Sequence, residues 1–567
     1  MPAAIDRRCA AIGLVTVALA NLLFLRGLAQ AIDPMLSMDP YYIAKARQPL
    51  AEIVAGGAAW GPLYALWLKP WVAALGDPLR VYTANVCALS VLVTVLLYLH
   101  LLLLTRRAAV ATGGAALFLI SDLNVPLFSK VSAFAVAVLL AGWIAAQLAT
   151  SAAWRGSLAA AAILLAGYAR PELYPASLIL LALMLVIPSG WSAGSRSRPG
   201  WWGTRQARRA RRARATAAVS LLLVGLALTV GLPIGGGDRG EGRLLQAFRE
   251  HFAWSWNEWH DSRVDFQTIW QRELGGATSL TEALAHKPAA VLRHGIGNAA
   301  GILRFLTTQA FDHYPVVRSA SQLENAATTA AVLALAAAFA FKPPLRRRWW
   351  ASPHGWHALV ACCSVAAAVV IHPSAHYLIF LAVTLLVAAA AAAARWLPPL
   401  PSSPLAAWAA ALACLLLVPR PFTAAPAGAR KVTDTVHFVR SLNLAAPVRV
   451  LTANDGLANL LGEGFEEVRL WQKGSQPLSD YLHEQDIALV VALELQHQSF
   501  AVGDPSWTWF QNAPETAGYG RLAVPGHPRV GVFVRRGTGE RLGGEEAEGG
   551  VGSKAMEGPW PAVAIAR

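Results

Sequence analysis

The chain has little charge for its length. Asp, Glu, Lys and Arg make up 14% of its 567 residues, whereas 55% are hydrophobic. A soluble globular chain normally carries about 25% charged residues. The shortage of charge, together with several apolar runs near 20 residues, excludes an ordinary soluble protein and predicts a polytopic α-helical membrane protein.

Three other absences narrow the range of possible functions. None of the five cysteines (Cys9, Cys87, Cys362, Cys363 and Cys414) has metal-site spacing, so we interpret them as small apolar fillers. The chain has no Gly-rich phosphate loop, so neither ATP nor a nucleotide sugar is implied. The apolar runs contain almost no Asp, Glu, Lys or Arg at mid-depth, which argues against an ion-coupled transporter.

The net charge of +15 raises the question of nucleic acid binding. The basic residues are mostly arginines clustered between apolar runs, as in residues 205–214, and this is the pattern of the positive-inside rule. We interpret residues 189–214 as a cytoplasmic topology anchor that contacts lipid headgroups, and expect membrane lipids and no nucleic acid as partners.

Alternating basic clusters and apolar runs predict about eleven spans. The first follows Arg7 and Arg8, so we expect an uncleaved helix with a cytoplasmic N-terminus. The predicted spans are Cys9–Leu25, Val81–Leu104, Ala108–Ile120, Val131–Thr150, Leu158–Tyr168, Leu173–Ile187, Ala215–Pro233, Ala326–Phe341, Trp356–Ile371, Leu378–Ala394 and Leu405–Val418. This topology gives a membrane domain over residues 1–420, with loops 30–80 and 234–325 outside. The aromatic segment Tyr41–Arg80 suits helices in the headgroup zone.

From Lys431 the pattern changes to short β-type and helical runs. Strands are predicted at 448–453, 468–471, 487–492 and 530–534, and helices at Leu457–Leu461 and Leu478–Glu484. The alternation predicts a small extracytoplasmic α/β domain over residues 431–536. The Gly- and Glu-rich tail, 537–567, is predicted to be disordered.

The ionisable residues of the membrane domain gather at its outer ends. They include Asp33 and Asp39 in the first loop, Asp122 in the second, Arg170 and Glu172 near the sixth span, and Lys130, His372 and His376. Carboxylates and cations at one interface suit a reaction between a membrane lipid and something outside.

Four outer segments carry a family resemblance. They are Asp39-Pro-Tyr-Tyr-Ile-Ala-Lys-Ala, Trp60-Gly-Pro-Leu-Tyr, Tyr168-Ala-Arg-Pro-Glu-Leu and His372-Pro-Ser-Ala-His-Tyr. In order and sidedness the chain from Cys9 to Val418 resembles the GT-C superfamily of integral-membrane glycosyltransferases, close to bacterial protein O-mannosyltransferase and aminoarabinose transferase relatives. The C-terminal domain is similar to the extra domain that many members carry.

The resemblance implies roles for matching positions. Asp39 would be the general base on the acceptor hydroxyl, with Asp33 as fallback and Asp122 as a further acid. The alternative for Asp39-Pro40 is a helix N-cap with Pro at N1, and both roles can coexist. Relatives often have an acidic pair where this chain has Asp-Pro, so the resemblance leaves a divalent metal open.

A polyprenyl-phosphate donor would need cations. Arg170 would bind the lipid phosphate through its guanidinium fork, helped by His376 and Lys130. The alternative for Arg170 is a local ion pair with Glu172. Tyr42, Glu172, His372 and His251 are further substrate-binding candidates, and His251 lies in a Trp-rich stretch that fits an interfacial anchor equally well.

The predicted protein is thus a multi-pass glycosyltransferase of the bacterial inner membrane. It would move a sugar from a polyprenyl-phosphate carrier to a lipid, glycan or protein acceptor on the outer side, inverting the anomeric centre. Two alternatives stay open: a lipid or polysaccharide transporter or flippase, and a non-catalytic scaffold for envelope assembly.

Overall fold

The structure is a computed structural model. It describes residues 6–26, 32–34, 39–55, 61–121, 123–124, 130–186, 202–232, 243–262, 264, 266–308, 322–341, 352–396, 430–452, 456–473, 476–493 and 505–537. Among the predicted features, Asp122, the eleventh span and nearly all of the C-terminal tail lie outside these residues.

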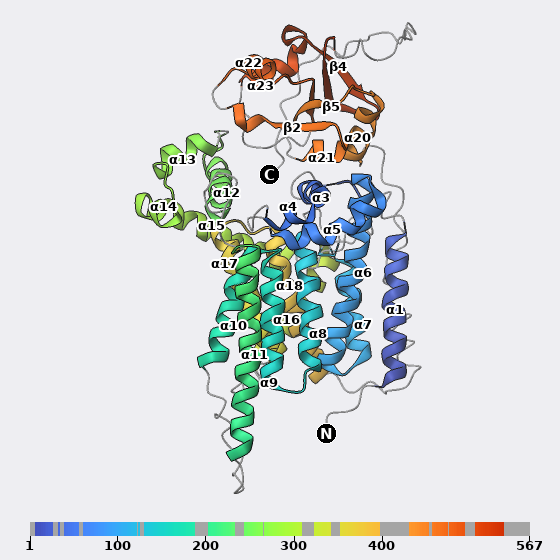
Figure 1. Cartoon of the computed structure of the whole chain (residues 1–567), viewed down its shortest axis with the longest axis vertical. Helices are drawn as coiled ribbons and strands as arrows, with labels where there is room; N and C mark the ends of the chain where they lie inside the picture. Colours follow the sequence, from blue (N-terminus) through green and yellow to red (C-terminus); the bar gives the residue numbers. More distant parts are fainter. Residues whose placement is uncertain are drawn as a thin grey trace.

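A bundle of apolar helices makes the chain a multi-pass membrane protein, as predicted (Figure 1). Among the described residues, five helices are long and apolar enough to cross a bilayer: α1 (Arg7–Leu25), α6 (Pro78–Thr105), α8 (Val131–Leu148), α17 (Pro353–Val370) and α18 (Ala375–Trp396). The others are α7 (Ala108–Ile120), α9 (Ala152–Gly167), α10 (Tyr174–Val186), α11 (Trp202–Thr229) and α16 (Gln322–Phe341). Each matches one predicted span by position.

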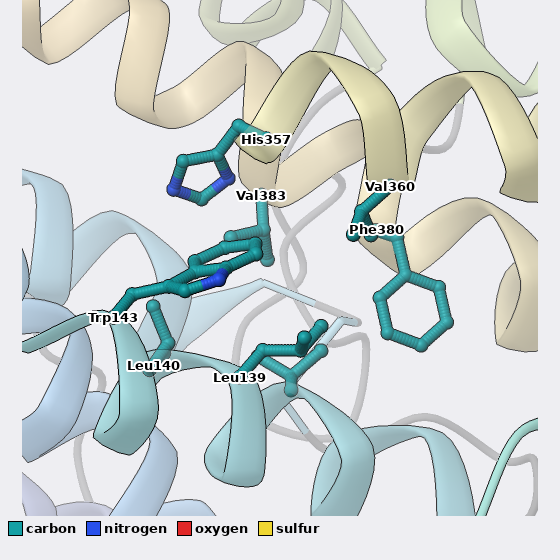
Figure 2. A pocket seen from close by; sticks show the side chains of 8 residues that line it. Leu139, Leu140, Trp143, His357, Val360, Phe380 and Val383 are labelled. Atoms are coloured by element: carbon teal, nitrogen blue, oxygen red, sulfur yellow. The ribbon is translucent and has the colours of Figure 1, made fainter. Parts of the chain in front are cut away.

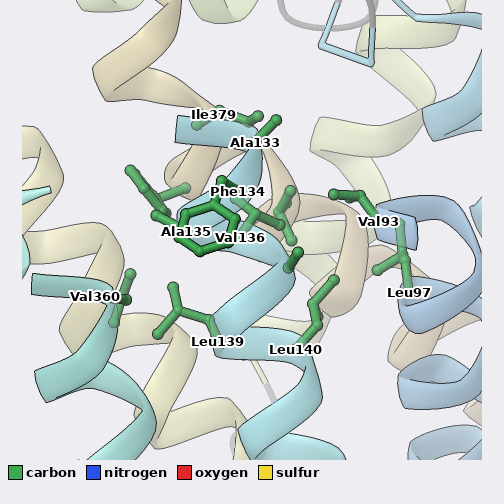
Figure 3. Packing of buried hydrophobic residues seen from close by; sticks show 14 of the residues in the cluster. Val93, Leu97, Ala133, Phe134, Ala135, Val136, Leu139, Leu140, Val360 and Ile379 are labelled. Carbon is green, nitrogen blue, oxygen red and sulfur yellow. The ribbon is translucent and has the colours of Figure 1, made fainter. Parts of the chain in front are cut away.

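Helix α8 lies inside the bundle, and its side chains are buried on nearly every face (Figure 3). Val136 and Leu140 belong to one apolar core with Val93 and Leu97 of α6 and with residues of α17 and α18. A small cavity of about 10 Å³, enough for about one water molecule, lies where α8, α17 and α18 meet and is lined in part by Trp143 and His357 (Figure 2).

Three short helices lie between the bundle and the C-terminal domain (Figure 1). They are α3 (Asp39–Arg47), α4 (Leu50–Ala55) and α5 (Pro62–Leu75). Asp77 then caps α6, because its carboxylate accepts the N–H of Arg80 at 3.0 Å. The aromatic segment predicted for the headgroup zone therefore folds as helices at one end of the bundle, which we call the domain end.

Four more helices extend at the domain end (Figure 1). They are α12 (Arg243–His260), α13 (Phe266–Leu274), α14 (Leu280–His286) and α15 (Pro288–Thr308). Helix α15 buries His294 and Asn298 but exposes 61–63% of Leu292, Ile296 and Leu303. The helix also buries Ile302 and Phe305, so apolar side chains lie on both its exposed and its buried faces.

The C-terminal domain is a five-stranded sheet with helices, which confirms the α/β prediction. Its strands run in the order β2 (Phe465–Arg469), β1 (Val448–Thr452), β3 (Leu489–Ala492), β5 (His527–Arg535) and β4 (Tyr519–Val524). Strand β1 is parallel to β2 and β3, whereas β5 is antiparallel to β3 and β4. The helices are α20 (Lys431–Ser441), α21 (Leu457–Leu461), α22 (Leu478–Glu484) and α23 (Pro505–Asn512), with 3₁₀ turns at Leu470–Lys473 and Pro514–Ala517.

One predicted strand was displaced and one strand was missed, and both lie at sheet edges. Strand β2 lies three residues before the predicted position, and β4 was not predicted at all. Edge strands are exposed on much of their surface and carry charged residues such as Glu466 and Arg521, so they lack the apolar signal of a central strand. Helices α21 and α22 have the predicted bounds.

Candidate functional site

The carboxylate of Asp39 is buried at the domain end of the bundle, with 1% of the residue exposed. Asp39 opens α3, and both of its oxygens accept the backbone N–H of Lys130, at 3.0 and 3.1 Å. Lys130 immediately precedes α8, where helix N–H groups lack intrahelical acceptors and the helix dipole favours an anion. Asp39 therefore joins α3 to the start of the central helix.

A second donor to Asp39 is the hydroxyl of Tyr64 on α5, at 3.2 Å. The same hydroxyl accepts from the side-chain amide of Asn85 at 2.7 Å, and Asn85 in turn accepts the indole N–H of Trp67 at 2.8 Å. Burial and the negative charge of Asp39 raise the pKa of Tyr64 well above its ordinary value. Tyr64 therefore stays protonated and donates to the carboxylate.

Arg170 of the third motif is a buried cation, with 5% of the residue exposed. It precedes a short 3₁₀ helix, Pro171–Leu173, and its Nε donates to Glu172 at 2.6 Å. Its guanidinium also lies over the ring of Tyr377, 4.8 Å from the centroid. Burial opposes the charge, but Glu172 and Tyr377 outweigh it and raise the pKa of Arg170 above its ordinary value.

Tyr42 lies close to a partner of the Asp39 carboxylate and within electrostatic range of the Arg170 guanidinium. Its ring meets that of Tyr64 edge to face at 4.9 Å, and it contributes to the electrostatic environment of Arg170. Because Tyr64 bonds Asp39, Tyr42 packs against a direct partner of the carboxylate.

Gly61 brings two of the sequence motifs into contact. Its φ is +54°, and a Cβ at this position would lie 1.5 Å from the carbonyl oxygen of Tyr168. Only glycine permits this approach, which sets the end of α9 and the following Arg170 against the start of α5. All four motif segments therefore meet at one place: Asp39 and Tyr42, Gly61 and Tyr64, Tyr168 and Arg170, and Tyr377.

Lys130, predicted to bind phosphate, lies beside Asp39. Its ammonium donates to the carbonyl oxygen of Asn124 at 3.0 Å, and 1% of the residue is exposed. Burial lowers the pKa of Lys130 to about 7, although the charge of Asp39 acts in the opposite direction. His376, also predicted for phosphate, lies next to Tyr377, with ring centroids 4.2 Å apart, and its ring nitrogen is 3.0 Å from the Ser374 hydroxyl.

Asp33 has structural partners in the C-terminal domain. Its carboxylate accepts the backbone N–H groups of Val432 and Thr433, both at 2.8 Å, and the Thr433 hydroxyl. These are donors of the first turn of α20, so Asp33 caps a helix about 400 residues away in sequence.

His251 and His372 stack on one another in a separate cluster. Their rings are parallel with centroids 4.8 Å apart, and Trp254 contacts both. Nearby, His294 of α15 is bonded to Ser255 and to the carbonyl oxygen of Ile371. Burial, with repulsion from His372, lowers the pKa of His251 to about 3 and that of His294 to about 4, and burial also lowers the pKa of His372.

The described hydrogen-bond partners of Asp39 do not form a ligand set for a divalent metal. Its oxygens face an N–H group and a hydroxyl, which are donors, whereas Mg²⁺ or Ca²⁺ requires several oxygen ligands. Within the described part of the chain, no three His, Cys, Asp or Glu side chains gather in metal-binding geometry.

Some residues were not predicted. Tyr64 stands in the second of the four motifs, but its bond to Asp39 needs the fold of α5. His100 and His357 form a buried pair inside the bundle, with Nε2 atoms 3.0 Å apart and Gln147 2.7 Å from His100. His100 stands alone in an apolar run and His357 lies more than 250 residues away in sequence, so no local signal marks the pair.

No family model and no curated protein sequence matches the chain. In structure it is similar to the arabinofuranosyltransferase AftD from Mycobacteria, with a TM-score of 0.41 and 16% identity over 94% of this chain and 42% of that one. It is also similar to ArnT from Cupriavidus metallidurans bound to undecaprenyl phosphate, with a TM-score of 0.35 and 12% identity over 93% and 97% of the two chains. The chain thus spans less than half the length of AftD. At TM-scores below 0.5, neither similarity identifies a substrate or assigns a role to any residue.

Proposed function

We propose that the chain is a membrane glycosyltransferase that moves a sugar from a polyprenyl-phosphate donor to an acceptor at the domain end of the bundle. The observation that carries the proposal is the meeting of four distant motifs around one buried carboxylate and one buried guanidinium. A base and an anion-binding cation are the two groups that such a transfer needs, and the contact of Gly61 with Tyr168 sets their segments against one another.

In the proposed reaction Asp39 is the general base. It takes the proton of the acceptor hydroxyl while that oxygen forms a bond to the anomeric carbon and the bond from this carbon to the phosphate oxygen breaks. A positioned base contributes about 10²–10⁴ in rate. The attack comes from the face opposite the phosphate, so the anomeric centre is inverted.

Arg170 binds the phosphate of the donor and of the polyprenyl-phosphate product. A guanidinium has five N–H donors, and the bonds to Glu172 use the Nε and one Nη2 donor. Glu172 and the ring of Tyr377 hold the remaining donors in a fixed orientation, which favours a fork contact with phosphate oxygens.

The site must open before it can work. Asp39 and Arg170 are only 1% and 5% exposed, so neither group is open to a sugar in this conformation. Catalytic geometry often forms only when substrate binds. We propose that donor binding separates α3 from the Tyr168–Arg170 segment, and that the polyprenyl chain lies along apolar helices of the bundle.

We also propose that the domain end faces the outside of a bacterial inner membrane. The Arg-rich start of α11 lies at the opposite end of the bundle (Figure 1). Clustered arginines favour the cytoplasmic side, which would put Asp39, Arg170 and the C-terminal domain outside.

The direct test uses purified protein in nanodiscs with labelled polyprenyl-phosphate sugars. Binding of polyprenyl phosphate should weaken about tenfold or more in Arg170→Lys, because lysine cannot make a fork contact. Arg80→Lys, at an exposed position of α6, is the matched control and should bind like wild type. Equal binding by all three proteins would contradict the role of Arg170.

The buried pair His100–His357 favours one rival, a proton-coupled transporter. Two imidazoles and Gln147 inside an otherwise apolar bundle are polar groups of the kind that proton pathways use. The rival predicts movement of a labelled lipid across proteoliposomes without chemical change, driven by a pH gradient and lost in His357→Phe. Transfer chemistry that is retained in His357→Phe would reject it.

A further inference from the structure

The C-terminal domain holds the first turn of α3 through Tyr41. The Tyr41 hydroxyl donates to Oε2 of Glu467 at 2.7 Å, and the guanidinium of Arg469 lies over the Tyr41 ring, 5.0 Å from its centroid. Both partners belong to β2, the edge strand of the sheet. We name these three residues, Tyr41, Glu467 and Arg469, the β2 clamp.

The partners of the Glu467 carboxylate restrain the clamp. The side chain of Glu467 is 9% exposed, and its other oxygen accepts the backbone N–H of Gly456. Arg469 lies 3.8 Å from the same carboxylate oxygen that accepts from Tyr41. A carboxylate with three partners has little freedom to move, so it fixes the position of the Tyr41 hydroxyl.

The turn that Tyr41 belongs to also carries the candidate base. Successive residues of an α-helix project about 100° apart, so Asp39, Tyr41 and Tyr42 point in different directions. Asp39 bonds Lys130 and Tyr64, Tyr42 meets Tyr64, and Tyr41 reaches the domain. A rotation of α3 cannot move one of these side chains without moving the others.

The domain does not need the clamp for its attachment. Asp33 caps α20, and Arg440 of α20 is paired with Asp77 at the start of α6. Leu79 of α6 is buried in the apolar core of the domain. These contacts join the domain to the bundle without involving α3. The clamp therefore adds a restraint on the orientation of α3 at an interface that other contacts already hold together.

We propose that the β2 clamp positions Asp39: the C-terminal domain fixes the rotation of α3 and thereby the direction of the base toward the acceptor. Tyr41, Glu467 and Arg469 are positioning residues that touch no substrate. This inference depends on the proposed glycosyl transfer for its rate effect, whereas the restraint on α3 stands independently of any activity.

The kinetic test compares Tyr41→Phe, Glu467→Gln and the double variant. Each single variant should lower kcat about 10- to 100-fold, with KM for the donor within about twofold of wild type, because small misplacements of a catalytic group cost rate and leave donor binding intact. The double variant should be no slower than the slower single variant, because both remove one contact.

The matched control is Arg440→Gln, which removes the pair with Asp77 and the bonds to the carbonyl oxygens of Leu460 and Leu461 in α21, and no bond to α3. It should lower the thermal stability of the domain and leave kcat within about twofold of wild type. Loss of kcat in Arg440→Gln equal to that in Tyr41→Phe would overturn the proposal, because domain attachment alone would then explain the effect.

Hydrogen exchange separates this inference from the proposed function. Amides of α3 should exchange faster in Tyr41→Phe and Glu467→Gln but not in Arg440→Gln, and this readout needs no turnover. Unchanged protection of α3 in both clamp variants rejects the clamp even if transfer is observed. Faster exchange of α3 in a protein without transfer activity supports the restraint and rejects the proposed function instead.

Discussion

Replacing Gly61 with alanine tests whether the contact between α5 and the Tyr168 carbonyl builds the site. At φ +54° an L-residue is strained by about 1–3 kcal/mol. The added Cβ would also lie 1.5 Å from the Tyr168 oxygen, so backbone must move. Overpacking of this kind costs about 1–3 kcal/mol, occasionally more. We therefore expect Gly61→Ala to lower the free energy of unfolding by about 2–6 kcal/mol in total.

Gly76→Ala is the matched control, because Gly76 ends the helix that Gly61 precedes. Its φ is +66°, but a Cβ there meets nothing within 4 Å. This variant should carry only the backbone strain, about 1–3 kcal/mol. The difference between the two variants isolates the collision with Tyr168.

Thermal unfolding in nanodiscs and binding of polyprenyl phosphate are the two assays for this pair. Gly61→Ala should unfold at a lower temperature than Gly76→Ala and should bind the lipid phosphate more weakly, because a shift of Tyr168 moves Arg170 as well. Equal unfolding temperatures and equal binding in the two variants would refute the reasoning, since the contact would then have no energetic consequence.

Three further predictions concern other parts of the molecule. Asp33→Ala removes an acceptor at the start of α20 and should lower the free energy of unfolding of the C-terminal domain by about 1–2 kcal/mol; a domain as stable as wild type in thermal unfolding would contradict it. The pKa of His251 is lowered to about 3 and that of His294 to about 4, below the value of about 6.5 in an unfolded chain. Their contribution to stability is therefore present above about pH 6.5 and lost as the pH falls toward about 4. Hydrogen exchange of α12 and α15, corrected for its intrinsic rate, should thus be faster at about pH 5 than at about pH 7.5. Equal protection at the two pH values would contradict this prediction. A nitroxide label at Leu292 or Leu303 should be more accessible to oxygen than to a water-soluble nickel chelate, because these exposed apolar positions of α15 suit acyl chains. A label at Leu522 of β4 should show the reverse order of accessibility. Water-like accessibility at both α15 positions would exclude lipid contact.

Much of the fold could be predicted from the sequence because its signals are local. A run of apolar residues between arginines specifies a helix without reference to the rest of the chain, and α7 has the predicted bounds, Ala108–Ile120. The central strands β1, β3 and β5 were found from dense apolar residues. The edge strands β2 and β4 were misplaced or missed, because an exposed, charged strand is defined by its neighbour and not by its own composition.

The site was predicted in part for a related reason. Asp39 and Arg170 stood out as charged residues next to apolar runs, and the structure gives both buried partners in one cluster. The hydroxyl of Tyr64 could not be assigned, because a tyrosine in an aromatic segment has no charge that requires a partner. The cap that Asp33 provides to α20 spans about 400 residues and could not be predicted from local sequence.

The central claim depends on Asp39, and the most direct measurement is the rate of sugar transfer in variants at this position. Wild type, Asp39→Asn and Asp33→Asn would be compared at saturating polyprenyl-phosphate sugar, with the labelled product separated by chromatography. Asparagine keeps the size of the side chain but cannot take a proton, so Asp39→Asn should be slower by about 10²-fold or more, whereas Asp33→Asn should stay within about threefold of wild type, since it lies at a helix cap. Transfer by Asp39→Asn at the wild-type rate would contradict the account.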